Sequence, residues 1–179
     1  MYLDVLIFGL LLGLVRKGSI RNLGQLPLQG LAWFLCLGAL ELGMQFTQAP
    51  ERRTLYTVLI MVSGAVGAVL LWLNRKLPGV WLVFAGLALN FAVMAANGGR
   101  MPVSEWAAVV TGQQEHLPQL ISGESSRHLL LTASTPLGFL GDVIPLPRWY
   151  PVPRVLSIGD IFIGAGVIRL MVWGMAARR

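Results

Sequence analysis

Five long apolar stretches separated by short polar segments dominate the sequence. They cover residues 1–15, 27–46, 54–73, 79–96 and 155–177. A helix of about 20 mostly apolar residues crosses a hydrocarbon core of roughly 30 Å, and the stretches meet or approach that length. The segments between them are rich in Gly, Pro and charge, which is typical of helix ends. The pattern predicts an all-α membrane protein with about five transmembrane helices, a single integral membrane domain over residues 1–179.

The composition favours a membrane protein and excludes several soluble classes. Hydrophobic residues make up 55% of the chain, charged residues only 12%, and the mean hydropathy is +0.68. Soluble domains carry roughly a quarter charged residues, and disordered chains are poor in apolar residues. The net charge of +6 fits a topogenic signal, and with so little polar surface we expect no nucleic-acid partner. Cys36, the only cysteine, is expected to be a small buried hydrophobe.

The charges flanking the apolar stretches predict an orientation. A signal peptide carries positive charge before its apolar run, whereas here Asp4 lies near its start and Arg16 and Lys17 follow it. We therefore expect an uncleaved first helix with its N-terminus outside. The inner segments would be 16–26, 74–78 and 178–179, and the outer ones 47–53 and 97–154. The inner segments hold seven Lys and Arg in 18 positions and the outer ones six in 65, so the positive-inside rule predicts a cytoplasmic C-terminus.

The segment 97–154 is the longest polar part of the chain, and we expect it to fold as a packed outer cap. Apolar residues at helical spacing over 103–110 predict a short helix, and the character of 128–132 favours a short strand. A loop of this length is usually functional or disordered. The aromatic residues expected to anchor the cap at the membrane interface are Trp106, Trp149 and Tyr150.

Three acidic residues, Asp4, Glu41 and Asp160, fall inside the predicted membrane helices, where a carboxylate is costly unless it faces protein or water. Asp160 is the sixth residue of the last stretch and Glu41 the fifteenth of the second, which places both near the outer surface. Asp160 is either a functional carboxyl or a buried group that joins helices. Glu41 either contributes to a site or makes a helix–helix hydrogen bond. Asp4 is expected at the membrane interface.

A second aspartate, Asp142, lies 18 residues before Asp160 in an apolar stretch. The prolines between them are Pro145, Pro147, Pro151 and Pro153. They preclude one continuous helix, so the chain can fold back and bring the two carboxyls together. Two carboxyls a few Å apart share one proton, and such a pair can act as general base and general acid on a peptide bond. This is the minimal apparatus of an aspartic peptidase.

The run GFLGD at 138–142, followed by 17 residues and Asp160 at the head of the last helix, resembles the C-terminal part of the lipoprotein signal peptidases. The resemblance implies that Asp142 and Asp160 form a catalytic dyad, with Ser157 in the place of that family's asparagine. The run AGLALN at 85–90 is similar to another motif of the family. This similarity implies that Asn90 is a polar residue facing the site.

The chain as a whole resembles a family of uncharacterised bacterial five-span membrane proteins, through NGGRMPV at 97–103 and SIGD at 157–160. This resemblance implies a multi-pass protein of the bacterial cell membrane. Asn97 and the two glycines after it are typical of a helix C-cap, and Arg100 beside them is either an ordinary surface residue or a clamp for a carboxylate or headgroup. The candidate substrate-binding residues are Asn90, Asn97, Arg100, Glu41 and Ser157.

Two functions remain open from the sequence. The first is a membrane-embedded aspartic hydrolase that acts at the outer surface on a membrane-associated peptide or lipoprotein-like substrate. The alternative is a non-catalytic membrane protein that binds a lipid or a partner subunit, with structural or cation-binding aspartates. His116, His128 and Cys36 do not have the spacing of a zinc site, so we expect no metal and no cofactor. The lipid bilayer is the other expected partner.

Overall fold

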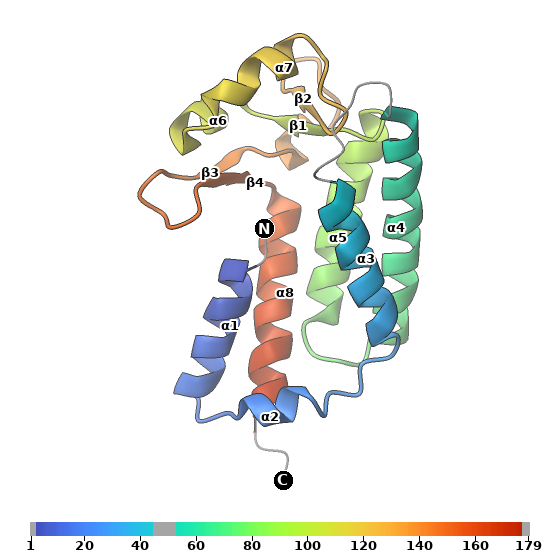
Figure 1. Ribbon diagram of the computed structural model, residues 1–179, viewed down its shortest axis with the longest axis vertical. Helices are drawn as coiled ribbons and strands as arrows, with labels where there is room; N and C mark the ends of the chain where they lie inside the picture. The colour runs from blue at the N-terminus through green and yellow to red at the C-terminus, as the bar shows by residue number, and fades with distance from the viewer. Residues whose placement is uncertain (1–2, 45–52, 177–179) are drawn as a thin grey trace.

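The computed structural model describes residues 3–44 and 53–176, and in these residues five helices form a bundle beneath a small cap (Figure 1). The bundle helices are α1 (Leu3–Val15), α3 (Leu31–Met44), α4 (Arg53–Leu73), α5 (Val80–Ala96) and α8 (Ile158–Met175). Each lies in one of the predicted apolar stretches, so the helical prediction is confirmed there. The short helix α2 (Ile20–Leu23) lies at the end of the bundle opposite the cap. The predicted ends at 1–2, 45–46 and 177 fall outside the described residues, as do Arg52 and the tail 178–179.

Within residues 3–44 and 53–176, two helices have the length and apolar character needed to cross a membrane: Thr54–Leu73 within α4 and Ile158–Met175, which is α8. Only 22% and 28% of their residues are buried inside the protein, which is low for the core helix of a soluble domain. The other three apolar segments, Leu3–Val15, Leu31–Leu40 and Val80–Ala96, are shorter than 18 residues. The protein is therefore mostly helical with two candidate membrane spans.

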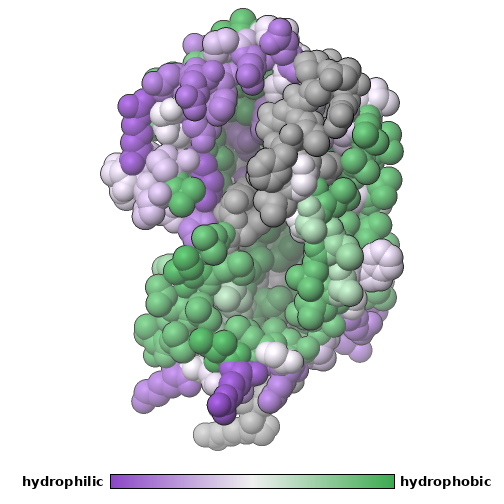
Figure 2. Space-filling view, viewed as in Figure 1, coloured by the Kyte–Doolittle hydropathy of each residue, from purple (hydrophilic) through white to green (hydrophobic). Residues whose placement is uncertain are grey.

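The surface of the bundle is apolar. Figure 2 shows hydrophobic side chains over the middle of the visible face, with hydrophilic side chains over the cap and at the opposite end. Phe8, Trp33, Leu55 and Trp81 each expose more than half of their surface. Soluble monomers rarely expose contiguous apolar patches of this kind, so the apolar zone favours membrane association. Cys36 is also exposed, which shows that the expectation of a buried cysteine is wrong: Cys36 lies on α3 among outward-facing residues.

Glycines bring α5 and α8 into backbone contact. A Cβ on Gly86 would lie 2.4 Å from the carbonyl oxygen of Gly159, and one on Gly166 would lie 2.6 Å from the carbonyl oxygen of Gly79. Small residues allow helices to approach this closely. On its other side α8 packs against α1. The α5–α8 pair is therefore closely packed, and it carries Asn90 and Asp160.

The cap contains strands, so the all-α prediction is wrong for this part of the chain. Its elements are β1 (Met101–Val103), α6 (Glu105–Thr111), η2 (Gln114–His116), α7 (Leu117–Ile121), β2 (His128–Leu130), η3 (Gly138–Leu140), β3 (Ile144–Leu146) and β4 (Arg154–Leu156). β1 and β2 pair in parallel, and β3 and β4 form an antiparallel hairpin. The predicted short helix and short strand are confirmed as α6 and β2. Short segments interrupted by proline do not sustain helices, and two small ladders satisfy their backbone groups instead.

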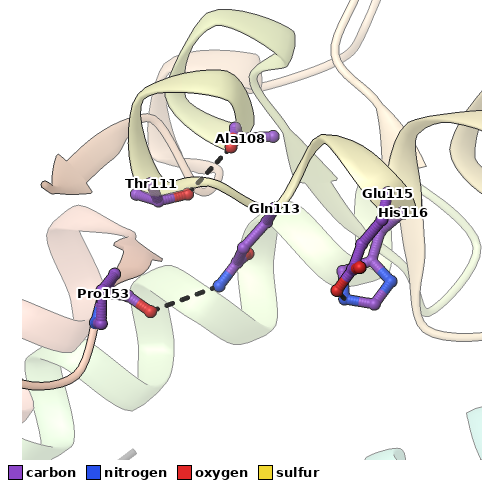
Figure 3. Close-up of polar contacts among 6 residues, drawn as sticks. All are labelled: Ala108, Thr111, Gln113, Glu115, His116 and Pro153. Atoms are coloured by element: carbon purple, nitrogen blue, oxygen red, sulfur yellow. Dashed lines mark hydrogen bonds and ion pairs between the residues drawn. The ribbon is translucent and has the colours of Figure 1, made fainter. Parts of the chain in front are cut away.

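Figure 3 shows three polar contacts within the cap, one of which joins two of its parts. The Gln113 side chain, just after α6, donates a 3.4 Å hydrogen bond to the carbonyl oxygen of Pro153 in the loop before β4. Thr111 donates to the carbonyl oxygen of Ala108, 3.1 Å away in the preceding turn of α6. Glu115 and His116 lie side by side at the exposed surface, with 3.8 Å between Glu115 Oε1 and His116 Nε2, and form an ion pair when the imidazole is protonated. The Gln113–Pro153 bond thus joins the end of α6 to the hairpin, whereas the other two contacts are local.

The β3–β4 hairpin is tied to the first helix. Arg154 forms an ion pair and a hydrogen bond with Asp4, and the Tyr150 hydroxyl donates a 3.0 Å hydrogen bond to the same carboxylate. The bond to Asp4 raises the pKa of Tyr150. Asp4 was expected as an interface residue; the structure shows it mostly buried and holding the hairpin against the bundle.

Candidate functional site

A cavity of about 490 Å³ lies between the cap and helices α3, α4, α5 and α8. One part of its wall is polar and the other part is apolar. The polar and charged residues discussed here are Asn90, Arg127, His128, Asp142 and Asp160. The apolar ones include Phe34, Leu37, Ile60, Leu71, Val83 and Leu87. The cavity therefore combines chemistry from the cap with an apolar space inside the helical bundle.

The backbone of Asp142 is fixed by the cap. Its N–H donates to the carbonyl oxygen of Pro102 at 2.8 Å, and its carbonyl oxygen accepts from the N–H of Ser104 at 2.9 Å. The residue before it is glycine for a steric reason, since a Cβ on Gly141 would lie 2.5 Å from the Pro102 oxygen. Asp142 is thus held beside β1, where its side chain lines the cavity.

The hairpin closes the distance between the two aspartates. Ile144 pairs with Leu156, and the N–H of Val143 donates to the carbonyl oxygen of Leu156 at 3.1 Å. This pairing returns the chain to the start of α8, close to where it left Asp142. The predicted fold-back between Asp142 and Asp160 therefore takes the form of a β-hairpin.

Asp160 lies in the first turn of α8 and forms a capping box with Ser157. The Asp160 N–H donates to Ser157 Oγ at 3.0 Å, and the Ser157 N–H donates to Asp160 Oδ2 at 3.1 Å. Such reciprocal bonds satisfy two donors that a helix start leaves unpaired. The other carboxylate oxygen, Oδ1, accepts a 3.2 Å hydrogen bond from Nδ2 of Asn90.

Asn90 links α5 to this capping box. Its Oδ1 accepts a 2.8 Å hydrogen bond from Ser157 Oγ while its amide donates to Asp160. Gly159 makes room for it, because a Cβ there would lie 2.1 Å from Asn90 Oδ1. Ser157 is fully buried and contributes through these bonds. Asn90, Ser157 and Asp160 thus form one closed network, and the positioning effect of Gly159 was missed from the sequence.

The environments of the two aspartates differ. Burial raises the pKa of Asp142 to about 8, and the negative charge of Asp160 adds to the shift. Among the described residues neither Asp142 nor Asp160 forms an ion pair with an arginine or lysine. At neutral pH Asp142 is therefore mostly protonated, next to an Asp160 whose oxygens accept two N–H donors. A proton-holding carboxyl beside such a carboxylate can act as an acid–base pair.

Arg127 and His128 also line the cavity, and sequence reasoning did not assign either to the site. Burial lowers the pKa of His128 to about 4, helped by the charges of Arg127 and His116, so its imidazole is neutral at pH 7. The Arg127 guanidinium lies over the ring of Tyr56, 5.3 Å from its centre. In the described part of the chain Arg127 Nε is buried without a hydrogen-bond partner. A basic residue directly before a predicted strand was the only signal for it.

The remaining predicted residues lie away from the cavity wall or outside the description. Asn97 ends α5: its side chain donates to the carbonyl oxygens of Val93 at 2.7 Å and Pro136 at 2.8 Å. The glycines after it have positive φ, +63° and +80°, as a C-cap predicts. Arg100 follows this turn and does not belong to the cavity lining. The side chain of Glu41 lies outside the described residues.

Comparison with known proteins places the chain among proteins of unknown function. Residues 25–172 match a family described as being of unknown function, DUF5317. A relative in Thermotoga maritima, itself named only as an uncharacterized protein, is 29% identical over 167 residues, which cover 93% of this chain and 88% of that protein. No solved structure matches the chain significantly. Since neither match carries an activity, the resemblance to lipoprotein signal peptidases stays a prediction.

Proposed function

The chain belongs to the DUF5317 family, and we propose that it is a membrane-embedded aspartic hydrolase that cleaves a membrane-associated peptide. One observation carries the proposal: Asp142 from the cap and Asp160 from the bundle line the same cavity and interact electrostatically. Their sequence separation is closed by the hairpin, so their meeting is a product of the fold. Asn90 and Ser157 would act as positioning residues that orient Asp160.

The raised pKa of Asp142 makes Asp142 the general acid and leaves Asp160 as the general base. In the proposed reaction the Asp160 carboxylate takes a proton from water as the water oxygen bonds to the peptide carbonyl carbon. Protonated Asp142 donates its proton to the carbonyl oxygen, which gives a neutral diol. The C–N bond then breaks as Asp160 passes its proton to the amide nitrogen and Asp142 regains one from a diol hydroxyl. Both carboxyls return to their starting states, and these steps require no cofactor.

We further propose that all five bundle helices span the bacterial cell membrane with the cap on the outer side. The apolar zone on the visible face of the bundle and the exposed apolar side chains of its helices support this placement. So does the charge distribution, since Arg16, Lys17, Arg75 and Lys76 are exposed at the bundle end opposite the cap, and positive charge favours the cytoplasmic side. In this placement the N-terminus is outside, the C-terminus is cytoplasmic, and the aspartates lie near the outer membrane surface.

The hydrolase proposal predicts that Asp142→Asn and Asp160→Asn each reduce peptide cleavage about a thousandfold. Four strains would be compared: one with the wild type as its sole copy, one with each variant as its sole copy, and one that lacks the protein. The measurement is mass spectrometry of peptide termini in the membrane fraction. Glu115→Gln, which changes an exposed acidic residue of the cap, is the matched control and should behave as wild type. Thermal unfolding in detergent would verify that the aspartate variants fold. If Asp142→Asn folds and its cells show the same peptide termini as wild-type cells, the proposal is contradicted.

The capping box favours a second candidate, a non-catalytic membrane protein in which Asp160 is structural. Asp160 already satisfies the first turn of α8 and bonds to α5, which is a sufficient reason for an aspartate there. On this alternative, Asp160→Asn lowers the unfolding temperature, while Asp142→Asn leaves both the termini and the growth of the cells unchanged. The two variants therefore separate the two functions.

A further inference from the structure

The Arg127 side chain is the least satisfied charged group in the wall of the cavity. It forms no hydrogen bond or ion pair with the described residues, and its buried Nε has no partner. Its guanidinium lies over the face of the Tyr56 ring, a contact that orients it without using its N–H donors. Arg127 as a whole is half-buried, and a charged group with a buried donor normally has a partner. The free donors of Arg127 therefore point to an anionic group supplied by a ligand.

The other titratable groups discussed for the cavity wall do not neutralise the charge of Arg127. His128 is neutral at pH 7, and so is most of Asp142. Asp160 is engaged with Asn90 and the Ser157 N–H. A phosphate group is a good match for a guanidinium because it can accept two parallel N–H bonds.

The rest of the cavity is apolar and extends into the bundle. Along α4 its wall runs from Ile60 to Leu71, about 16 Å of helix at 1.5 Å per residue. Phe34, Leu37 and Val83 contribute further apolar side chains. In the proposed membrane placement these residues belong to membrane-spanning helices, where a lipid tail is the abundant apolar ligand. An anionic peptide would match the arginine but not the apolar space.

We infer that the cavity binds one anionic phospholipid, with its phosphate on Arg127 and an acyl chain along the apolar wall formed by α3, α4 and α5. The inference rests on the proposed membrane placement and does not require hydrolysis. It names the ligand class of a site that also contains the two aspartates. A lipid bound there would lie beside the catalytic pair and limit the space open to a substrate.

The test uses the full chain in detergent, titrated with dioleoyl phosphatidylglycerol or dioleoyl phosphatidylcholine and followed by native mass spectrometry. Wild type is expected to bind one phosphatidylglycerol more tightly than phosphatidylcholine. Arg127→Gln should weaken phosphatidylglycerol binding about tenfold or more, whereas Arg127→Lys should retain much of it. Arg148→Gln, which removes an arginine bonded to Gln114 on the exposed cap, is the matched control and should bind as wild type.

Several results would overturn the inference. Equal binding of the two lipids by wild type, or unchanged phosphatidylglycerol binding by Arg127→Gln, removes the role of Arg127. If inorganic phosphate binds the site as tightly as phosphatidylglycerol does, the ligand is a free anion. If only an acidic peptide binds, the site is a peptide site. Ile60→Phe narrows the apolar part without touching Arg127 and should also weaken lipid binding. Peptide termini in cells with Asp142→Asn test the hydrolase proposal, whereas lipid binding by Arg127→Gln tests this one, so a failure of either proposal is distinguished from a failure of the other.

Discussion

The bundle and the cap are stabilised by different interactions, and the candidate site lies where they meet. The bundle has an apolar exterior, and its central pair α5–α8 is held by backbone contact at glycines. The cap has a hydrophilic exterior and is held by short strand ladders and side-chain hydrogen bonds. Asp160 comes from the bundle and Asp142 from the cap. The alignment of the pair therefore depends on both kinds of interaction, and each can be weakened separately.

The largest effect on stability is expected from the bundle, in Gly86→Ala. Its new Cβ would lie 2.4 Å from the carbonyl oxygen of Gly159 and 2.8 Å from the Ile163 side chain, so the helices must separate, at a cost of about 2–3 kcal/mol. Thermal unfolding in detergent measures this. The matched control is Gly38→Ala, because a Cβ at Gly38 meets nothing within 4 Å and helix propensity favours alanine by up to about 1 kcal/mol. Equal unfolding temperatures for the two variants would show that α5 and α8 are not in backbone contact.

An intermediate effect is expected where the cap is tied to the bundle, in Asp4→Asn. The ion pair with Arg154 is mostly buried, with 14% and 18% of the two side chains exposed, so its loss leaves a buried guanidinium without its counter-charge and costs about 2 kcal/mol. Limited proteolysis should detect faster cleavage in the loop between β3 and β4. Glu115→Gln is the control, since that ion pair is exposed and should contribute well under 1 kcal/mol. A hairpin as resistant in Asp4→Asn as in wild type would show that Asp4 does not hold it.

A smaller effect, confined to the cavity, is expected from pH. The folded chain keeps a proton on Asp142 up to about pH 8, whereas the unfolded chain releases it near pH 4, so stability falls as pH rises between these values. His128 acts in the opposite direction: its pKa falls from 6.5 to about 4, and stability falls as pH drops through that range. Below pH 6.5 the two effects oppose each other. Between pH 6.5 and 8 only the Asp142 effect remains, at most about 1.4 kcal/mol per pH unit.

Unfolding temperatures in detergent from pH 4 to 9 measure this balance. Wild type should lose stability between pH 6.5 and 8, and Asp142→Asn should not. His128→Gln should lose stability as the pH rises from about 4, because the opposing titration of His128 is removed. A wild-type profile that is flat above pH 6.5 would contradict the protonated Asp142 on which the proposed acid–base roles depend.

Local patterns in the chain were sufficient to predict the helices. An apolar run of helical length is stable as a helix in any apolar surrounding, so the five bundle helices lie where hydropathy places them. The same holds for the C-cap at Asn97 and the two glycines after it, whose positive φ follows from residue type. The prolines between Asp142 and Asp160 correctly indicated that the chain turns back there. Each of these features depends on neighbours close in sequence.

The strands of the cap and the polar wall of the cavity depend on partners far away in the chain. β1 exists because residues 101–103 meet residues 128–130, and no local pattern specifies that partner. Asn90, Ser157 and Gly159 form one network only because α5 and α8 approach closely enough for a hydrogen bond across them. Arg127 resembles any other surface arginine until tertiary packing buries its Nε and places its guanidinium over Tyr56. Hydropathy and residue type describe single positions, whereas burial, ladder pairing and coupled charges are properties of pairs that only the folded chain brings together.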